Sequence, residues 1–91
     1  MIGFINRLLQ KREYKPLNLI ELSGKNLRSN FRYISKLNRN VSIAPVLKSN
    51  GYGHGLTQIA TVLDSMNPVF FCVDSLFEAY QLLNLNLKTK D

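Results

Sequence analysis

Two apolar runs that each lead into a helical spacing are the feature that most constrains the fold. Residues 41–47 and 69–73 are apolar at most positions, which suits strands covered on both faces. After each run, apolar residues recur three or four positions apart, as on one face of a helix. The first of these helices is expected to begin at Leu56 and to stop near residues 67–68, and the second begins at Leu76. Strands that alternate with helices in this way predict parallel βαβ units, so the expected fold class is α/β.

Two further elements are expected before the first apolar run. Residues 17–22 alternate loosely between apolar and polar and predict a strand, which turn residues 23–24 would end. A helix from about residue 25 to residue 38 follows, because its apolar positions share one face. These positions are Leu27, Phe31, Ile34 and Leu37.

The last helix carries a start signal of its own. Ser75 and Glu78 match the S-x-x-E capping box, in which each of the two side chains accepts a free backbone N–H. Spacing alone predicts an apolar, buried face on this helix. Its members are Leu76, Ala79, Tyr80 and Leu83. The ring of Tyr80 is therefore expected in the core.

The sequence also indicates an incomplete domain. Pro45 lies inside the first apolar run, where it can donate no ladder hydrogen bond, so a bulge or a free edge is expected there. Residues 87–91 stand where another parallel strand would be due. Two or three parallel strands cannot close a barrel, and they would leave an unpaired edge. We therefore expect this chain to be part of a larger α/β domain.

Charge and targeting features give weaker guidance. The net charge is +6, from twelve basic and six acidic residues, and the basic side chains are spread over a leader (residues 1–16) and the helix at 25–38. Such a spread is typical of a solvated helix face, so neither nucleic acid nor a membrane is an expected partner. The leader lacks the apolar core of a secretory signal, and a single cysteine, Cys72, indicates a reducing, intracellular setting.

The segment that carries chemistry begins at Lys48. This lysine stands at the carboxyl end of the first apolar run, which is where α/β proteins place functional groups. Three glycines follow it within residues 51–55, so the backbone there can approach a ligand, and the next helix offers free N–H groups to an anion. A lysine beside a phosphate site suits an enzyme that uses pyridoxal 5′-phosphate (PLP). On physical grounds alone, a solvated lysine next to an ordinary turn is the more common explanation of such a pattern.

A family resemblance favours the first interpretation. Residues 46–55, V-L-K-S-N-G-Y-G-H-G, closely resemble the PLP-attachment motif of alanine racemases, usually written V-V-K-A-N-A-Y-G-H-G. The flanking segments 19–23, 26–30 and 73–79 resemble the same family at the same relative positions. The resemblance covers roughly residues 17–87 and rests on a motif that is rarely met elsewhere.

The resemblance implies roles for individual residues. Lys48 corresponds to the lysine that holds PLP as a Schiff base and serves as acid or base on one face of the substrate. Tyr52 corresponds to the tyrosine that hydrogen-bonds the cofactor phosphate. Ser49 and Gly51 replace the usual alanines, and the glycine loosens the turn that positions Tyr52. His54 also matches the family, and we expect it to hydrogen-bond the turn rather than to take part in catalysis.

The resemblance also implies a fold and a reaction. Residues 17–91 would form the first βα units of a TIM-type (β/α)8 barrel, incomplete in this chain. The reaction would be the PLP-dependent interconversion of L-alanine and D-alanine in the cytoplasm, supplying D-alanine for peptidoglycan, with no metal. The full-length enzyme would be a homodimer. A tyrosine from the partner subunit and an arginine facing the pyridine nitrogen would lie outside these 91 residues, so the chain alone would be inactive.

Two alternatives remain open from the sequence. One is another PLP enzyme of the same fold type, such as a racemase of broader specificity or an amino-acid decarboxylase, although the Tyr52–Gly55 segment speaks against decarboxylases. The other is a small basic binding module without catalysis. Salt-sensitive binding to DNA or RNA, without PLP absorbance, would favour the module.

Overall fold

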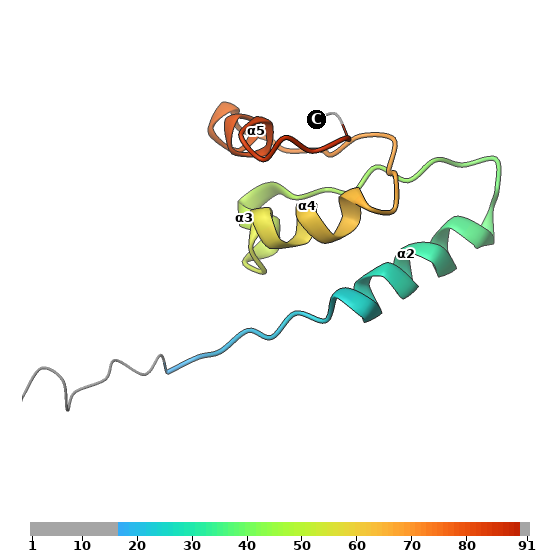
Figure 1. Cartoon of the computed structure of the whole chain (residues 1–91), viewed down its shortest axis with the longest axis horizontal. Coiled ribbons are helices and arrows are strands. Elements are labelled where there is room, and N and C mark those ends of the chain that lie inside the picture. The colour runs from blue at the N-terminus through green and yellow to red at the C-terminus, as the bar shows by residue number, and fades with distance from the viewer. Residues whose placement is uncertain (1–16, 90–91) are drawn as a thin grey trace, which may run out of the picture.

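A computed structural model describes residues 17–89, which form four helices (Figure 1). They are α2 (Gly24–Leu37), α3 (Lys48–Tyr52), α4 (Leu56–Asp64) and α5 (Leu76–Leu83). Helix α4 is central, because α2, α3 and α5 all pack against it. The basic leader, residues 1–16, lies outside the described residues.

Helix α2 confirms the predicted helix at 25–38 within one residue at each end. Its N-terminal cap is Ser23, whose side-chain oxygen accepts the backbone N–H of Asn26 at 3.1 Å. Leu27 and Phe31 of the expected apolar face pack against the core, whereas Ile34 and Leu37 are exposed. The helix ends where Asn38 takes an extended conformation.

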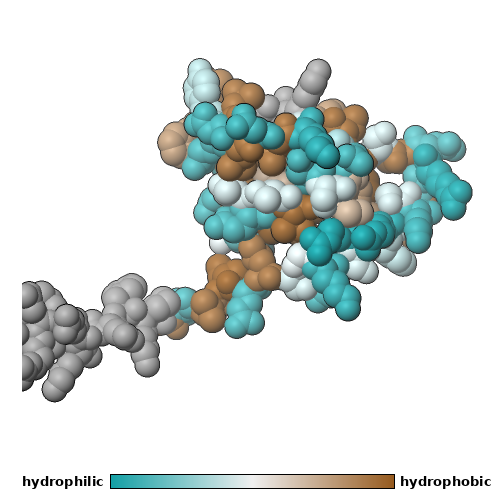
Figure 2. Space-filling model, viewed as in Figure 1, coloured by the Kyte–Doolittle hydropathy of each residue, from teal (hydrophilic) through white to brown (hydrophobic). Residues whose placement is uncertain are grey.

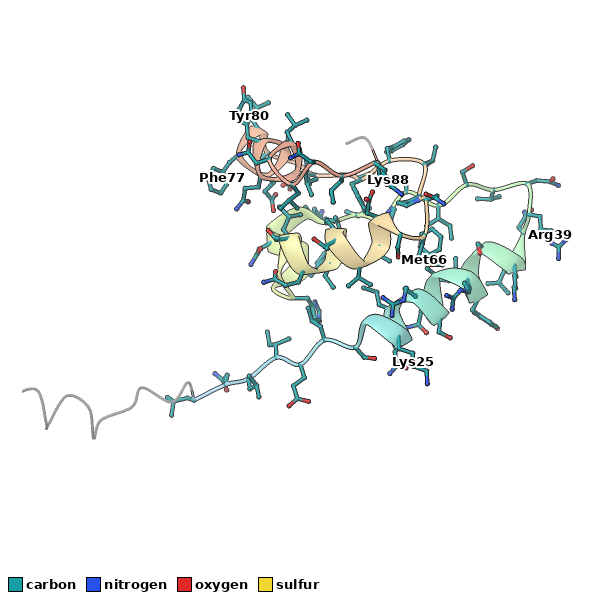
Figure 3. All side chains as sticks on the ribbon, viewed as in Figure 1. Lys25, Arg39, Met66, Phe77, Tyr80 and Lys88 are labelled. Atoms are coloured by element: carbon teal, nitrogen blue, oxygen red, sulfur yellow. The ribbon has the colours of Figure 1, made fainter. Side chains whose placement is uncertain are left out.

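Helices α4 and α5 are also confirmed, and each begins at the expected residue, although α4 ends at Asp64 and not near residues 67–68. Ser75 caps α5 as predicted, since its oxygen accepts the backbone N–H of Glu78 at 3.2 Å. The buried face of α5 was predicted wrongly, however. Glu78 and Leu82 are the buried residues, and Tyr80 is 62% exposed rather than part of the core. Figure 3 shows Tyr80 and Phe77 projecting away from the other helices. Spacing identified an apolar face, but no described element lies beside it.

The predicted strands are the main correction. Within residues 17–89 the apolar runs form no strand. They share one isolated parallel bridge, between Val46 and Cys72, and a further hydrogen bond from the Val69 N–H to the Ile43 carbonyl at 3.0 Å. The N–H of Leu47 donates to the Cys72 carbonyl at 2.8 Å, and the N–H of Cys72 donates to the Pro45 carbonyl at 2.9 Å. The runs therefore lie parallel, as expected. Pro45 takes part through its carbonyl, which needs no N–H.

The strand expected at residues 17–22 is absent as well. This segment is extended and exposed, with Leu17 and Leu19 at 100% and 75% exposure. In Figure 2 its brown apolar side chains stand off from the body of the molecule. A strand needs hydrogen bonds from a neighbouring backbone, and no described segment supplies them to residues 17–22.

The core forms where the two apolar runs meet α4 and α5. Leu47 and Phe71 come from the runs, and their partners come from the two helices. These partners are Leu56, Ala60, Leu63 and Leu82. The core therefore holds Leu47, the residue before Lys48, with only 3% of its surface exposed. None of the helices in this described part has the length and apolar character of a membrane span.

Candidate functional site

Lys48 and Tyr52 lie at the two ends of the short helix α3. The segment before it is anchored by the buried Leu47, whose N–H is bonded to Cys72. The segment after it leads directly into α4 at Leu56. Lys48 thus follows the paired part of the first apolar run, as the sequence predicted.

The backbone of α3 is a left-handed turn rather than an ordinary loop. Ser49, Asn50, Gly51 and Tyr52 have φ values of 54°, 55°, 64° and 56°, and Gly53 continues at 84°. A left-handed conformation costs roughly 1–2 kcal/mol for each residue that carries a Cβ, less for asparagine. Such strain persists only where the surroundings hold it, and it concentrates at functional sites. The turn is therefore a constrained feature that the rest of the fold must maintain.

Backbone hydrogen bonds close this turn. The N–H of Gly51 donates to the Leu47 carbonyl at 2.8 Å, and the N–H of Gly53 donates to the Ser49 carbonyl at 3.0 Å. Both bonds join residues four apart, as in a helix. Lys48 is thereby held on a rigid backbone although its own side chain is exposed.

Asn50 is the residue through which the turn is tied to its surroundings. Its side-chain Oδ1 accepts the N–H of Leu56 at 2.9 Å, and its carbonyl accepts the N–H of Gly55 at 2.9 Å. Its own N–H donates to Oε2 of Glu78 at 2.8 Å, which reaches across to α5. Three groups of one residue thus connect α3 with α4 and α5.

His54 hydrogen-bonds the turn, which confirms the structural role expected for it. Its Nδ1 lies 3.1 Å from the carbonyl oxygen of Gly51, and its backbone N–H donates to the same oxygen at 3.1 Å. Because a carbonyl oxygen can only accept, Nδ1 carries the proton in this contact.

The donor set of the turn fits PLP. Lys48 offers a primary amine to the aldehyde carbon, and Tyr52 offers a phenolic hydroxyl to a phosphate oxygen. Both side chains are exposed, with Tyr52 at 59%. The described residues contain no cluster of three or more His, Cys, Asp or Glu side chains that could hold a metal ion.

Two surface pockets lie away from the side chains of Lys48 and Tyr52. The first, about 430 Å³, opens between α2 and α4, and His54 lies at its edge. The second lies between the end of α2 and residues 66–69. Neither is lined by Lys48 or Tyr52. The chemistry of the site therefore rests on the turn itself and not on an enclosed cavity.

Comparison with known proteins decides the family. The family model for the N-terminal domain of alanine racemases matches residues 22–90, which include the whole turn. The chain belongs to the alanine racemase family. The family resemblance expected from residues 46–55 is thereby confirmed.

Individual alanine racemases show how much of the enzyme is present. The chain is 35% identical to the one from Macrococcus caseolyticus over 82 residues, which cover 90% of the chain and 21% of that protein. It is 37% identical to the one from Carboxydothermus hydrogenoformans, covering 68% of the chain and 17% of the relative. No solved structure matches the chain significantly. The chain thus spans about a fifth of the length of these curated alanine racemases, as expected for an incomplete piece.

Sequence reasoning found the two ends of the turn but missed the residues that hold it. Asn50 was seen only as part of the motif, and Glu78 only as a helix cap. The capping box is half formed, because Oε2 of Glu78 accepts the N–H of Asn50 and Oε1 accepts the Ser75 hydroxyl, not the Ser75 backbone N–H. A contact between residues 28 positions apart leaves no periodic signal in a single sequence.

Proposed function

We propose that the protein to which these residues belong interconverts L-alanine and D-alanine with PLP, and that Lys48 and Tyr52 hold the cofactor. One observation carries the proposal: the motif of residues 46–55 lies on a constrained left-handed turn at the end of a paired apolar run. Membership of the alanine racemase family supports the same chemistry. Residues 17–91 would then belong to the first βα units of a TIM-type barrel.

Lys48 and Tyr52 each have a defined task in this proposal. The Lys48 amine would hold the cofactor and would move a proton to or from Cα of the amino acid. The Tyr52 hydroxyl would donate a hydrogen bond to the cofactor phosphate. When bound, PLP supplies an electron-withdrawing ring that stabilises negative charge at Cα.

Lys48 needs the rest of the protein to become an effective base. Only an unprotonated amine is nucleophilic. Burial or a nearby positive charge favours the unprotonated form. We therefore assign catalysis to a full-length homodimer in the cytoplasm, with the opposite proton-transfer group and the remaining phosphate contacts outside these 91 residues.

Site-selective labelling tests the proposal directly. The full-length protein is incubated with PLP, the adduct is reduced with borohydride, and the modified lysine is located by peptide mass mapping. We expect the label at Lys48 in preference to Lys25, Lys36 and Lys88, which are exposed lysines outside the motif.

Two arginine variants complete the design, because arginine keeps the charge but forms no such adduct. Lys48→Arg should abolish the preferred label, and Lys25→Arg should leave it intact. Equal labelling of all lysines, or unchanged PLP uptake by Lys48→Arg, would refute the assignment.

A further inference from the structure

We propose that Glu78 is a positioning residue that holds the left-handed turn, and with it Lys48 and Tyr52, in the geometry that receives the cofactor. The inference rests on the proposed function for the identity of the cofactor. It concerns an acidic side chain on α5, outside the motif of residues 46–55.

The burial of Glu78 is unusual for an acidic side chain. Only 8% of its surface is exposed, and it is the one buried polar or charged residue among residues 17–89. A buried carboxylate is costly unless its oxygens are hydrogen-bonded. Oε2 accepts the Asn50 N–H at 2.8 Å, and Oε1 accepts the Ser75 hydroxyl at 3.2 Å. Both oxygens therefore have partners.

The bond to Asn50 is the one that reaches the site. Asn50 is two residues from Lys48 and two from Tyr52, so a constraint on its N–H acts at the middle of the turn. A hydrogen bond from an N–H to a carboxylate is about twice as strong as one between neutral groups. It opposes the tendency of Ser49, Asn50 and Tyr52 to leave the left-handed region.

The position of Glu78 on its helix adds to this effect. Glu78 lies in the first turn of α5, where the helix dipole favours a negative charge. Figure 1 shows α5 beside α3, so the carboxylate lies between the helix that carries it and the turn it contacts. Helix α5 thus supports the turn through one side chain.

If Glu78 only capped α5, its replacement would have other consequences than if it positions the turn. The cap of α5 is the Ser75 oxygen, which accepts the Glu78 backbone N–H and needs no Glu78 side chain. Ser75→Ala therefore removes the cap of α5 and the partner of Oε1, but it leaves Oε2 bonded to the Asn50 N–H. Glu78→Met removes the carboxylate but keeps the side-chain length and a good helix former. Comparing Ser75→Ala with Glu78→Met therefore distinguishes an effect on the stability of α5 from an effect on the position of the turn.

The experiment compares these variants with Glu78→Gln in the full chain. Glutamine retains a carbonyl oxygen for the Asn50 N–H and an amide group for the Ser75 oxygen. The readouts are the PLP concentration that gives half-maximal labelling of Lys48, the absorbance of the lysine adduct, and hydrogen exchange of the Asn50 amide. We expect Glu78→Met to require about tenfold more PLP, the loss expected for one charge-assisted hydrogen bond, and to speed exchange at Asn50.

Rescue and control complete the test. Glu78→Gln should recover most of the labelling, and Ser75→Ala should label like the original chain even where its melting temperature falls. Labelling and Asn50 exchange unchanged in Glu78→Met would overturn the inference. If the original chain shows no preferred label at Lys48, the proposed function fails. The positioning role is then decided by Asn50 exchange alone, and unchanged exchange in Glu78→Met refutes it.

Discussion

The side-chain Oδ1 of Asn50 accepts the backbone N–H of Leu56 at 2.9 Å and thereby joins the left-handed turn to the first residue of α4. The first N–H groups of a helix have no partner within the helix. Gly55, the residue directly before α4, has no side chain that could supply one. Asn50 therefore caps the helix from six residues upstream while holding its own strained backbone.

Asn50→Ala should consequently lower the free energy of unfolding by about 1–3 kcal/mol. The estimate combines a lost cap with an alanine forced into a left-handed conformation. Asn50→Asp keeps the acceptor and tolerates this conformation, so it should cost much less. Urea unfolding followed by circular dichroism measures both variants, and equal losses would contradict the cap.

Tyr52→Phe tests the proposed phosphate contact. Removing the phenolic hydroxyl deletes a hydrogen bond to a charged group, which should weaken PLP binding roughly tenfold. The label should still fall on Lys48, because the amine is unchanged. Titration of PLP against adduct absorbance measures the effect.

Tyr33→Phe is the matched control, since Tyr33 is similarly exposed but lies on α2. An equal response of the two variants would argue against a phosphate role for Tyr52.

Asp64 should make stability depend on pH. Burial alone would raise the pKa of Asp64, but hydrogen bonds from the Thr89 hydroxyl, the Thr89 N–H and the Lys88 N–H, together with the Lys88 charge, lower it overall from 3.8. A folded-state pKa below the unfolded one gives stability that is present above the unfolded pKa. That stability is lost as the pH falls through the folded pKa.

Asp64→Asn should therefore destabilise the chain at neutral pH and lose its effect in acid. Because the carboxylate is solvent-accessible, we expect a loss of no more than about 1 kcal/mol at pH 7. Thermal unfolding between pH 7 and pH 3 tests this, with the exposed Asp74→Asn as control. A gap between original and variant that stays constant over this range would disprove the linkage.

Truncation of Phe71 should lower the free energy of unfolding far more than truncation of Phe77. Phe71 is 2% exposed in the core beside the parallel bridge, whereas Phe77 is 72% exposed on the outer face of α5. Phe71→Ala should cost about 3–5 kcal/mol by leaving a cavity, and Phe77→Ala should cost less than about 0.5 kcal/mol. Chemical denaturation distinguishes them, and a comparable loss in both would show that the outer face of α5 is buried in solution.

The helices and the turn could be anticipated from sequence because their signals are local. The apolar spacing of Leu27 and Phe31 and the capping signal at Ser75 each lie within one or two helical turns of the structure that they predict. The same reasoning failed for the buried face of α5. Apolar spacing says which side chains share a face, but only a neighbouring element makes that face a core.

The sequence by itself determined three helices, the position of Lys48 at the end of an apolar run, and the motif that assigns the family. Tertiary structure alone decided that the apolar runs meet at a single bridge, that residues 17–22 stay unpaired, and that Glu78 turns to Asn50. The physical reason is the range of the bonds. A helix satisfies its backbone within a few residues, whereas a strand or a buried carboxylate depends on a partner that the fold must bring to it.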